Sequence, residues 1–246
     1  MQNNLQAILT RFTVSFLLVI GAASAVSQEH QKEADKLYER RAFFEASSGY
    51  VAAYAKEKNI DSRAHCAFYA GECYRLLHNY DLALEWYDKA LGLRYANTNP
   101  VIFLLYGDVL RDQENFFDAM EWYEKYGSAA DRSLADARIE ASDIAALSID
   151  EPPSRYIVEP IYMINSPSYD FAPIYSSKNN TLVFASSRES SEGTGEDPMT
   201  GEAFMDLFST TCANCDDKEV LSGKQKQRWS EPIPLGNTIC TSSNEG

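Results

Sequence analysis

Apolar residues recur every three or four positions between residues 29 and 147, a spacing that predicts amphipathic helices. Aromatic and aliphatic side chains occupy most of these positions, and Pro100 is the only proline in the stretch. Because a proline inside a helix stops or bends it, the helical pattern is expected to break at that residue. A helical half is therefore predicted over residues 28–150.

The hydrophobic pattern changes after Asp150. Pro152 and Pro153 stop any helix, and the residues that follow are β-branched, aromatic or turn-forming. Short apolar stretches alternate with turn sequences, which indicates an antiparallel sheet. A domain boundary is expected here, with a β half over residues 151–246. Its predicted strands are Arg155–Met163, Ala172–Ser176, Thr181–Ala185 and Phe204–Thr210.

The helical half contains an internal repeat. One set of alanine and tyrosine positions recurs at offsets of 37 and then 36 residues. A small residue stands twelve positions before the first alanine of each copy, where it lets two helices approach closely. The recurring positions are Ala46, Tyr50 and Ala53, then Ala83, Tyr87 and Ala90, then Ala119, Tyr123 and Tyr126, and the small residues are Ala34, Gly71 and Gly107.

These positions resemble the tetratricopeptide repeat, a pair of antiparallel helices of about 34 residues. The second copy matches best, with Gly71, Tyr74, Ala83, Tyr87 and Ala90 in the places of the pattern. The resemblance implies an all-α superhelix of stacked helix pairs, closed by a covering helix near its end. An ordinary helical bundle is the alternative. The side chains expected to cover the last pair are Leu134, Ala137, Ile139, Ile144 and Leu147.

In such a superhelix the first helix of each pair lines a concave groove, and two acid–base pairs fall there. Glu72 stands three residues before Arg75, and Asp108 stands three residues before Arg111. If the groove binds a partner segment, these four residues are the candidates to contact it. The same spacing also suits a surface ion pair, which contributes a few tenths of a kcal/mol.

The β half repeats as well. Glu159-Pro160-Ile161 returns as Glu231-Pro232-Ile233, 72 residues later, and the segment from Ile164 to Asp170 returns 75 residues later. One four-strand unit lies between the copies, and a repeated four-strand unit is the blade of a β-propeller.

The segments Tyr169–Ser176, Leu182–Arg188 and Asp206–Phe208 resemble the TolB-type, WD-like propeller repeat. Under this resemblance Asp170 and Arg188 brace the blade and are not catalysts. The expected fold is thus α+β and multidomain, a tetratricopeptide-like superhelix followed by an incomplete antiparallel propeller blade. Residues 151–246 would hold the first blade and the start of the second, in an amino-terminal fragment of a longer protein.

Residues 1–25 have the features of a signal peptide. Arg11 precedes the apolar stretch Phe12 to Ile20, and the small residues Ala23-Ser24-Ala25 follow it. The apolar stretch is too short for a membrane span, which needs roughly 20 residues. The chain carries 36 acidic and 22 basic side chains, a formal charge of −14, which argues against nucleic-acid binding. An exported, acidic protein without a membrane span after signal removal is expected.

The order of an exported tetratricopeptide array and a propeller resembles a Bacteroidetes group of cell-envelope proteins. Members of this group often continue into an OmpA-like peptidoglycan-binding domain, and some serve type IX secretion or gliding. The resemblance implies a periplasmic, outer-membrane-associated scaffold that binds cell-envelope proteins through its helical groove. Peptidoglycan would be bound only through a downstream domain that lies outside this sequence.

Enzyme motifs find little support in the sequence. It contains no G-x-S-x-G, no H-E-x-x-H and no phosphate-binding glycine loop, so neither an enzyme nor a cofactor is predicted. Peptidases of the prolyl-oligopeptidase type also carry propellers, with the catalytic domain elsewhere in the chain. The amino-terminal part of such a serine peptidase is therefore the alternative function.

The cysteines do not form one framework. Cys66 and Cys73 are two helical turns apart, too far for a disulfide, and are expected to be buried packing residues. Cys212 and Cys215 have the C-x-x-C spacing of a disulfide loop, a redox pair or half of a zinc site. Export favours the disulfide, with free thiols and then metal or redox chemistry as the alternatives.

The segment from Glu189 to Asp206 contains six acidic residues, no basic residue and three glycines. Such a segment could bind calcium, with Glu196, Asp197 and Glu202 as the candidate ligands. The segment lacks the alternating order of an EF-hand loop. A solvated loop is therefore the favoured interpretation, and no metal site is predicted.

Overall fold

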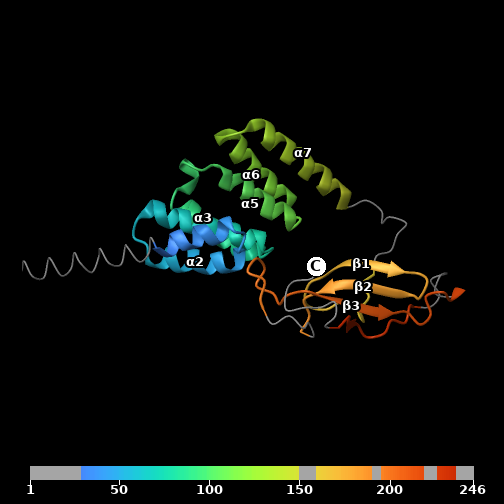
Figure 1. The fold of residues 1–246 in the computed structure, drawn as a ribbon. Helices are drawn as coiled ribbons and strands as arrows, with labels where there is room; N and C mark the ends of the chain where they lie inside the picture. The colour runs from blue at the N-terminus through green and yellow to red at the C-terminus, as the bar shows by residue number, and fades with distance from the viewer. Residues whose placement is uncertain (1–28, 150–158, 190–194, 219–225, 237–246) are drawn as a thin grey trace, which may run out of the picture. The chain divides into compact units, whose positions relative to one another are not determined.

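The computed structural model describes residues 29–149, 159–189, 195–218 and 226–236. The chain divides into two compact units, Met1–Pro152 and Pro153–Gly246. The described part of the first unit is helical, and the second contains a four-stranded antiparallel sheet (Figure 1). The predicted α+β class is confirmed at this level.

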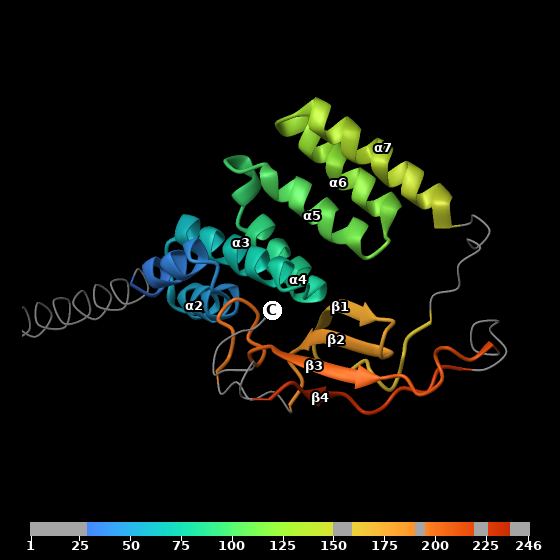
Figure 2. The ribbon, with the colours of Figure 1, turned by 45° about the vertical axis from the view of Figure 1, so that its right-hand side comes forward.

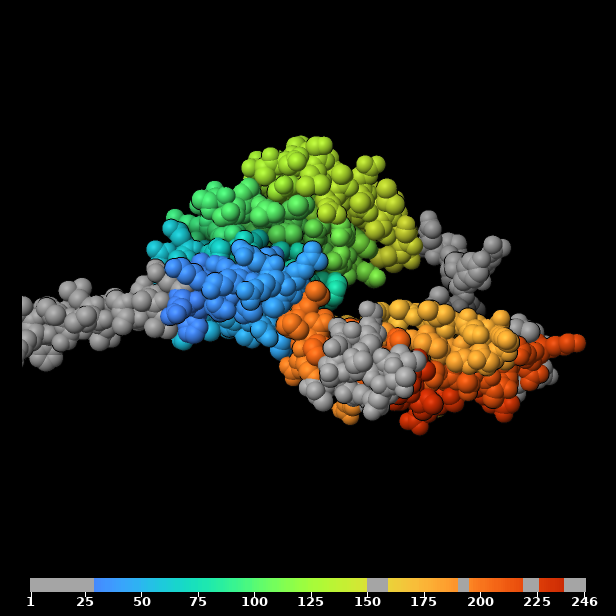
Figure 3. Space-filling view, viewed as in Figure 1, coloured from blue at the N-terminus to red at the C-terminus, as the bar shows by residue number. Residues whose placement is uncertain are grey.

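The helical unit consists of consecutive helices joined by short connections. Helices adjacent in sequence pack against each other, so the colours in Figure 3 run from blue to yellow-green across this unit in chain order. Residues 29–39 are helical. They are followed by α2 (Phe43–Lys56), α3 (Ile60–Leu76), α4 (Tyr80–Gly92), the 3-10 helix η1 (Tyr95–Asn97), α5 (Val101–Asp112), α6 (Phe116–Ala129) and α7 (Arg132–Ile149).

The turn inside each helix pair has the same backbone form. Arg41, His78 and Glu114 have left-handed φ angles of 63°, 56° and 62°. They are spaced by 37 and 36 residues, the offsets of the sequence repeat. The residue after each of them donates its N–H to a carbonyl five residues back, which is the Schellman pattern at a helix end. These bonds run from Ala42 to Leu37 at 2.9 Å, from Asn79 to Tyr74 at 2.8 Å and from Asn115 to Leu110 at 2.9 Å.

The aligned positions of the sequence repeat form the core of the helical unit. Tyr50, Tyr87 and Tyr123 are completely buried. Gly71 lies at a close approach of two helices, because a Cβ added there would come within 2.6 Å of the Tyr87 ring. A Cβ at Gly107 would meet the Tyr123 ring at the same distance. The predicted role of these small residues is confirmed.

Helix α7 packs on α6, but of the five side chains predicted to cover the last pair only Ile139 lies at the contact. Ala135 and Ser142 are buried, and Ile139 contacts the cluster around Tyr123. These positions are spaced four and three residues apart, so they share one side of the helix. Small side chains there let the two helices come close. Leu134, Ile144 and Leu147, three of the predicted covering residues, are exposed.

The sheet has the strand order β1-β2-β3-β4, with every neighbouring pair antiparallel (Figure 2). Strand β1 is an edge strand and contains Pro173, whose missing N–H is tolerated at an edge. Ile164, Phe184 and Phe208 form the small buried core. The strands are β1 (Asp170–Ser176), β2 (Thr181–Ser186), β3 (Asp206–Thr211) and β4 (Ile233–Pro234), of which the first three confirm predicted strands.

The strand predicted over Arg155–Met163 is wrong for its described part, residues 159–163, and residues 155–158 lie outside the described ones. Pro160 has no N–H to give to a ladder. The Ile161 carbonyl accepts hydrogen bonds from the N–H groups of Ile164 and Asn165, at 2.7 and 2.9 Å. These bonds close a turn in place of a strand. The fourth strand of the sheet comes instead from the later segment β4.

Candidate functional site

A tyrosine–carboxylate hydrogen bond recurs in each helix pair. The Tyr50 hydroxyl donates to Asp35 at 2.7 Å, Tyr87 donates to Glu72, and Tyr123 donates to Asp108 at 2.9 Å. Each acid precedes its tyrosine by 15 residues and follows directly after Ala34, Gly71 or Gly107. Sequence reasoning found two of these acids but missed Asp35. The signal was present, since Asp35 stands 37 residues before Glu72.

Both predicted acid–base pairs form ion pairs within their own helices. Arg75 donates through Nε and a terminal nitrogen to the two Glu72 oxygens, at 2.9 and 3.0 Å. Arg111 lies 3.5 Å from Asp108, and Arg138 of α7 approaches the same oxygen at 3.6 Å. The Glu72 side chain is only 7% exposed, so its carboxylate is committed to Tyr87 and Arg75. The side chains of Arg75 and Arg111 are one quarter exposed.

We expect Tyr87→Phe to lower the free energy of unfolding by about 1–3 kcal/mol, because it removes a hydrogen bond from the buried Glu72 carboxylate. Burial and the Glu72 charge raise the pKa of Tyr87, so the hydroxyl stays protonated and donates. The matched control is Tyr106→Phe, whose hydroxyl donates to the exposed Asp88 at 3.2 Å. Urea denaturation followed by circular dichroism measures both variants. Equal losses would contradict a special contribution from the buried bond.

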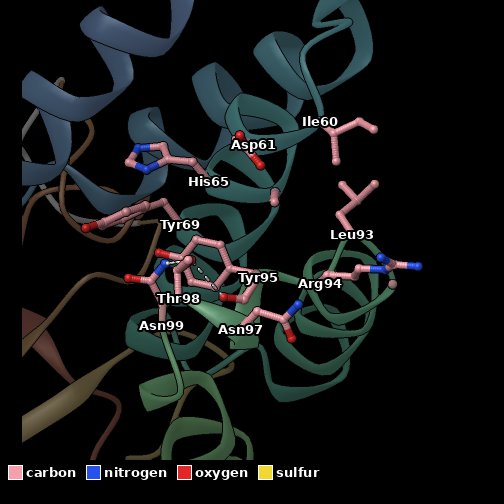
Figure 4. Close-up of a pocket in the computed structure, with 12 residues that line it drawn as sticks. Ile60, Asp61, His65, Tyr69, Leu93, Arg94, Tyr95, Asn97, Thr98 and Asn99 are labelled. Carbon is pink, nitrogen blue, oxygen red and sulfur yellow. Dashed lines mark hydrogen bonds between the residues drawn. The ribbon is translucent and has the colours of Figure 1, made fainter.

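A pocket of about 910 Å³ opens between the first half of α3 and the connection that follows α4 (Figure 4). Helix α3 supplies one side, and η1 with its flanking residues supplies the other. The helix begins at Ile60 because the Asn59 side chain accepts a hydrogen bond from the Ser62 N–H at 3.0 Å, a standard N-terminal cap. Arg94, with a left-handed φ of 63°, turns the chain out of α4 and into η1.

Aromatic rings form the inner part of this pocket. Tyr95 stacks on the buried Phe68, with ring centroids 4.6 Å apart and planes 20° from parallel. Tyr69 packs against both His65 and Tyr50, at centroid distances of 4.5 and 5.5 Å. These ring contacts restrict the movement of both Tyr95 and Tyr69.

The polar side chains of the pocket differ in how they are held. His65 lies 3.1 Å from the Asp35 carboxylate of the preceding helix pair, and Asn99 donates to Thr98 at 2.9 Å. Asp61, Arg94 and Asn97 are exposed. None of these three side chains has a hydrogen bond or ion pair with another part of the chain that the structure describes. They are therefore available to a ligand.

A polar cluster in the β unit is built around the residues predicted to brace it. Arg188 bonds the Asp170 carboxylate at 2.7 Å, the Ile164 carbonyl at 2.7 Å and the Ser186 hydroxyl at 2.8 Å. Asp170 also accepts from the N–H and hydroxyl of Ser166, at 2.6 and 2.9 Å. The cluster ties the turn before β1 to the end of β2.

Acid is expected to loosen this cluster. Burial alone would raise the pKa of Asp170, but hydrogen bonds from Ser186, Ser166 and Arg188 outweigh it and hold the pKa below its usual value. A carboxyl whose pKa is lowered by folding stabilises the fold above its unfolded pKa of about 3.9, and this stabilisation is lost as the pH falls toward the folded pKa. Peptides from β1 and β2 should therefore exchange hydrogen faster, relative to their intrinsic rates, as the pH drops from 5 to 3.

In Asp170→Asn this acid dependence should be weaker, because the titrating carboxyl is gone. Asp217→Asn changes an exposed carboxyl of the same unit and should keep the wild-type profile. An Asp170→Asn profile that matches the wild type would assign the acid effect to other groups.

Cys212 and Cys215 are joined in a disulfide. Cys212 also pairs with Trp229 as an isolated β-bridge, so the small loop is attached to the sheet beyond β3. Cys66 and Cys73 are free and buried in the helical core, as predicted. Burial raises the pKa of each of these thiols to about 12, which makes them poor nucleophiles at neutral pH.

The three calcium candidates lie at a narrow turn. Glu196 bridges to Ala203, and the Asp197 N–H donates to the Glu202 carbonyl at 2.8 Å. Gly201, with φ of 76°, makes the turn possible. The Asp197 carboxylate accepts from the Met199 N–H at 2.8 Å. Across the described residues, no three His, Cys, Asp or Glu side chains gather in a group that could hold a metal ion.

The predicted signal peptide, residues 1–25, lies outside the described residues. Among the helices that the structure describes, none is both long and apolar enough to cross a membrane. No protein-family model matches the chain, and no curated protein matches it significantly.

Proposed function

We propose that the helical unit is a tetratricopeptide-like array and that it serves as a protein-binding module. The observation that carries this proposal is one structural unit, recurring at 37 and 36 residues: a small residue, a carboxylate, a left-handed turn and a buried tyrosine. Repeats of paired helices stack into extended surfaces whose common use is to bind other proteins. The exposed parts of Arg75 and Arg111 on the first helices are the candidate contacts.

The β unit, in this proposal, is a TolB-like or WD-like propeller blade. Four antiparallel strands in sequence order and the Asp170–Arg188 brace support it. Phe171 and Ile174 of β1 are exposed by 39% and 71%. Such exposure suits a blade, because apolar residues on a blade are covered by neighbouring blades.

The whole chain would then be an exported scaffold of the periplasm, associated with the outer membrane. The apolar leader sequence and the acidic composition support export of a soluble binding protein. A tether to peptidoglycan, and a role in type IX secretion or gliding, would require an OmpA-like domain outside this sequence.

Site-specific photo-crosslinking in cells tests the binding role. The photo-crosslinking residue p-benzoylphenylalanine is placed at Asp112, at the end of α5 and next to Arg111, or at Glu85 in α4 as the matched control. Both side chains are exposed, but Glu85 belongs to the second helix of its pair. We expect discrete protein adducts from position 112 and few from position 85. Adducts of equal yield from both positions, or none from either, would overturn the proposal.

A further inference from the structure

We infer that the pocket between α3 and η1 binds an extended peptide segment of a partner protein, by seating one large apolar or aromatic side chain between Ile60 and Tyr95. The inference rests on the proposed protein-binding function and gives the partner its chemistry. It concerns a place on the array that the sequence did not single out.

Aliphatic side chains at the pocket mouth favour an apolar anchor. Ile60 is 62% exposed on the first turn of α3, although isoleucine is among the residues most often buried. Leu93 also lines the pocket, as Figure 4 shows. An apolar side chain placed against them would remove this surface from water. Saccharides and phosphates are polar and would gain little from these two residues.

The inner wall is preorganised for such an anchor. Phe68 stacks on one face of the Tyr95 ring, and this contact favours the position in which the ring lines the pocket. Tyr69 is held in the same way by His65 and Tyr50. Rings that are already fixed lose little conformational entropy when a ligand binds, which raises affinity.

The rim suits a peptide backbone. The rim can both accept and donate hydrogen bonds: the carboxylate of Asp61 accepts, the guanidinium of Arg94 donates, and the carboxamide of Asn97 does both. None of these side chains has a hydrogen-bond partner among the described residues. A peptide backbone offers N–H and C=O groups in alternation and carries no charge. One negative and one positive side chain give the rim no net charge, so it matches a neutral backbone better than a polyanion.

Helix α3 links the pocket to the predicted groove, because it carries both His65 of the pocket and the Glu72–Arg75 ion pair. His65, Tyr69 and Glu72 are spaced four and three residues apart along α3, so they follow one face of the helix. A chain that leaves the pocket and follows α3 would reach the partly exposed side chain of Arg75. The pocket would therefore anchor a segment that continues over the first helices of the array.

A phage-displayed library of random twelve-residue peptides, selected on the full chain, tests this inference. We expect the recovered peptides to share one aromatic or large aliphatic position. The most frequent peptide is then synthesised with a fluorescent label, and its dissociation constant is measured by anisotropy. Ile60→Glu should raise that constant at least about tenfold, because it places a charge against the buried anchor. Asn97→Ala should raise it about threefold through loss of a rim contact.

The matched control is Phe117→Glu, which adds the same charge at a 72% exposed apolar residue of α6 outside the pocket. It should leave the dissociation constant within about twofold of the wild type. Replacing the anchor of the peptide with alanine should weaken binding to the wild type, but add little to the effect of Ile60→Glu.

Other results would contradict either the role of the pocket or the binding function of the helical unit. Peptides whose binding ignores Ile60 but weakens with Arg111→Glu would leave the array a binding module and remove the pocket from it. A library that yields no binding peptide would overturn both this inference and the proposed function. A tetramer of N-acetylglucosamine, tested by titration calorimetry, should not bind; if it binds and Ile60→Glu abolishes that binding, the pocket is a saccharide site.

Discussion

Gly71→Ala is expected to lower the free energy of unfolding of the helical unit by about 1–3 kcal/mol, the usual cost of overpacking a core. The added methyl group would lie 2.6 Å from the Tyr87 ring and 3.2 Å from the backbone oxygen of Ala83. The ring cannot retreat without breaking its hydrogen bond to Glu72. Gly107→Ala should show the same effect in the next helix pair, against Tyr123.

Gly92→Ala is the matched control, because a Cβ there would meet nothing within 4 Å. Alanine has the higher helix propensity, so this variant should be unchanged or more stable by up to about 1 kcal/mol. Urea denaturation monitored by circular dichroism compares the variants. If Gly71→Ala were as stable as Gly92→Ala, the close helix approach at Gly71 would not be a requirement of the fold.

Arg188→Ala is expected to destabilise the β unit by about 3 kcal/mol, because removing one partner of a largely buried ion pair leaves the other charge unpaired. Asp170 and Arg188 are only 16% and 15% exposed. The same variant frees the Ile164 carbonyl and removes the cation that lies about 5 Å from the rings of Phe184 and Phe208. Loss of the guanidinium therefore weakens the small core as well as the turn.

Hydrogen exchange of peptides from β1, β2 and β3 measures this loss in the full chain, without interference from the helical unit. Arg228→Ala serves as the control, because Arg228 belongs to the same unit and is exposed. The double variant with Asp170→Asn should cost less than the sum of the single variants, since the two side chains share one interaction. If the strands of Arg188→Ala were as well protected from hydrogen exchange as those of Arg228→Ala, the Asp170–Arg188 pair would not be needed for the stability of the β unit.

Much of the helical unit was predictable because its packing is periodic. Buried tyrosines and alanines repeat at fixed offsets, so their positions alone identified the three helix pairs. The turns were harder to predict, because left-handed residues at helix ends are usually glycine, and here Arg41, His78 and Glu114 take that conformation. Backbone hydrogen bonds, which have no side-chain signature, form these turns.

The β unit shows the limit of reading strands from composition. Residues 159–163 have strand-like side chains, but a proline and a local turn direct their backbone elsewhere, whereas the two-residue strand β4 is too short to give a pattern. The pocket between α3 and η1 was also not predictable from the pattern of hydrophobic residues. One of its sides is η1 and its flanking residues, an irregular segment with no hydrophobic period.

The tyrosine–carboxylate bonds have a consequence for how such a chain can change in length during evolution. Each bond joins the two helices of a single pair: Tyr87 and Glu72, for example, are separated by only 15 residues. Duplication or deletion of one helix pair therefore carries the acid and its hydroxyl donor together. No copy inherits a buried carboxylate without its tyrosine, which would cost about 1–3 kcal/mol. Such a chain can therefore gain or lose a helix pair without leaving one of these carboxylates unpaired.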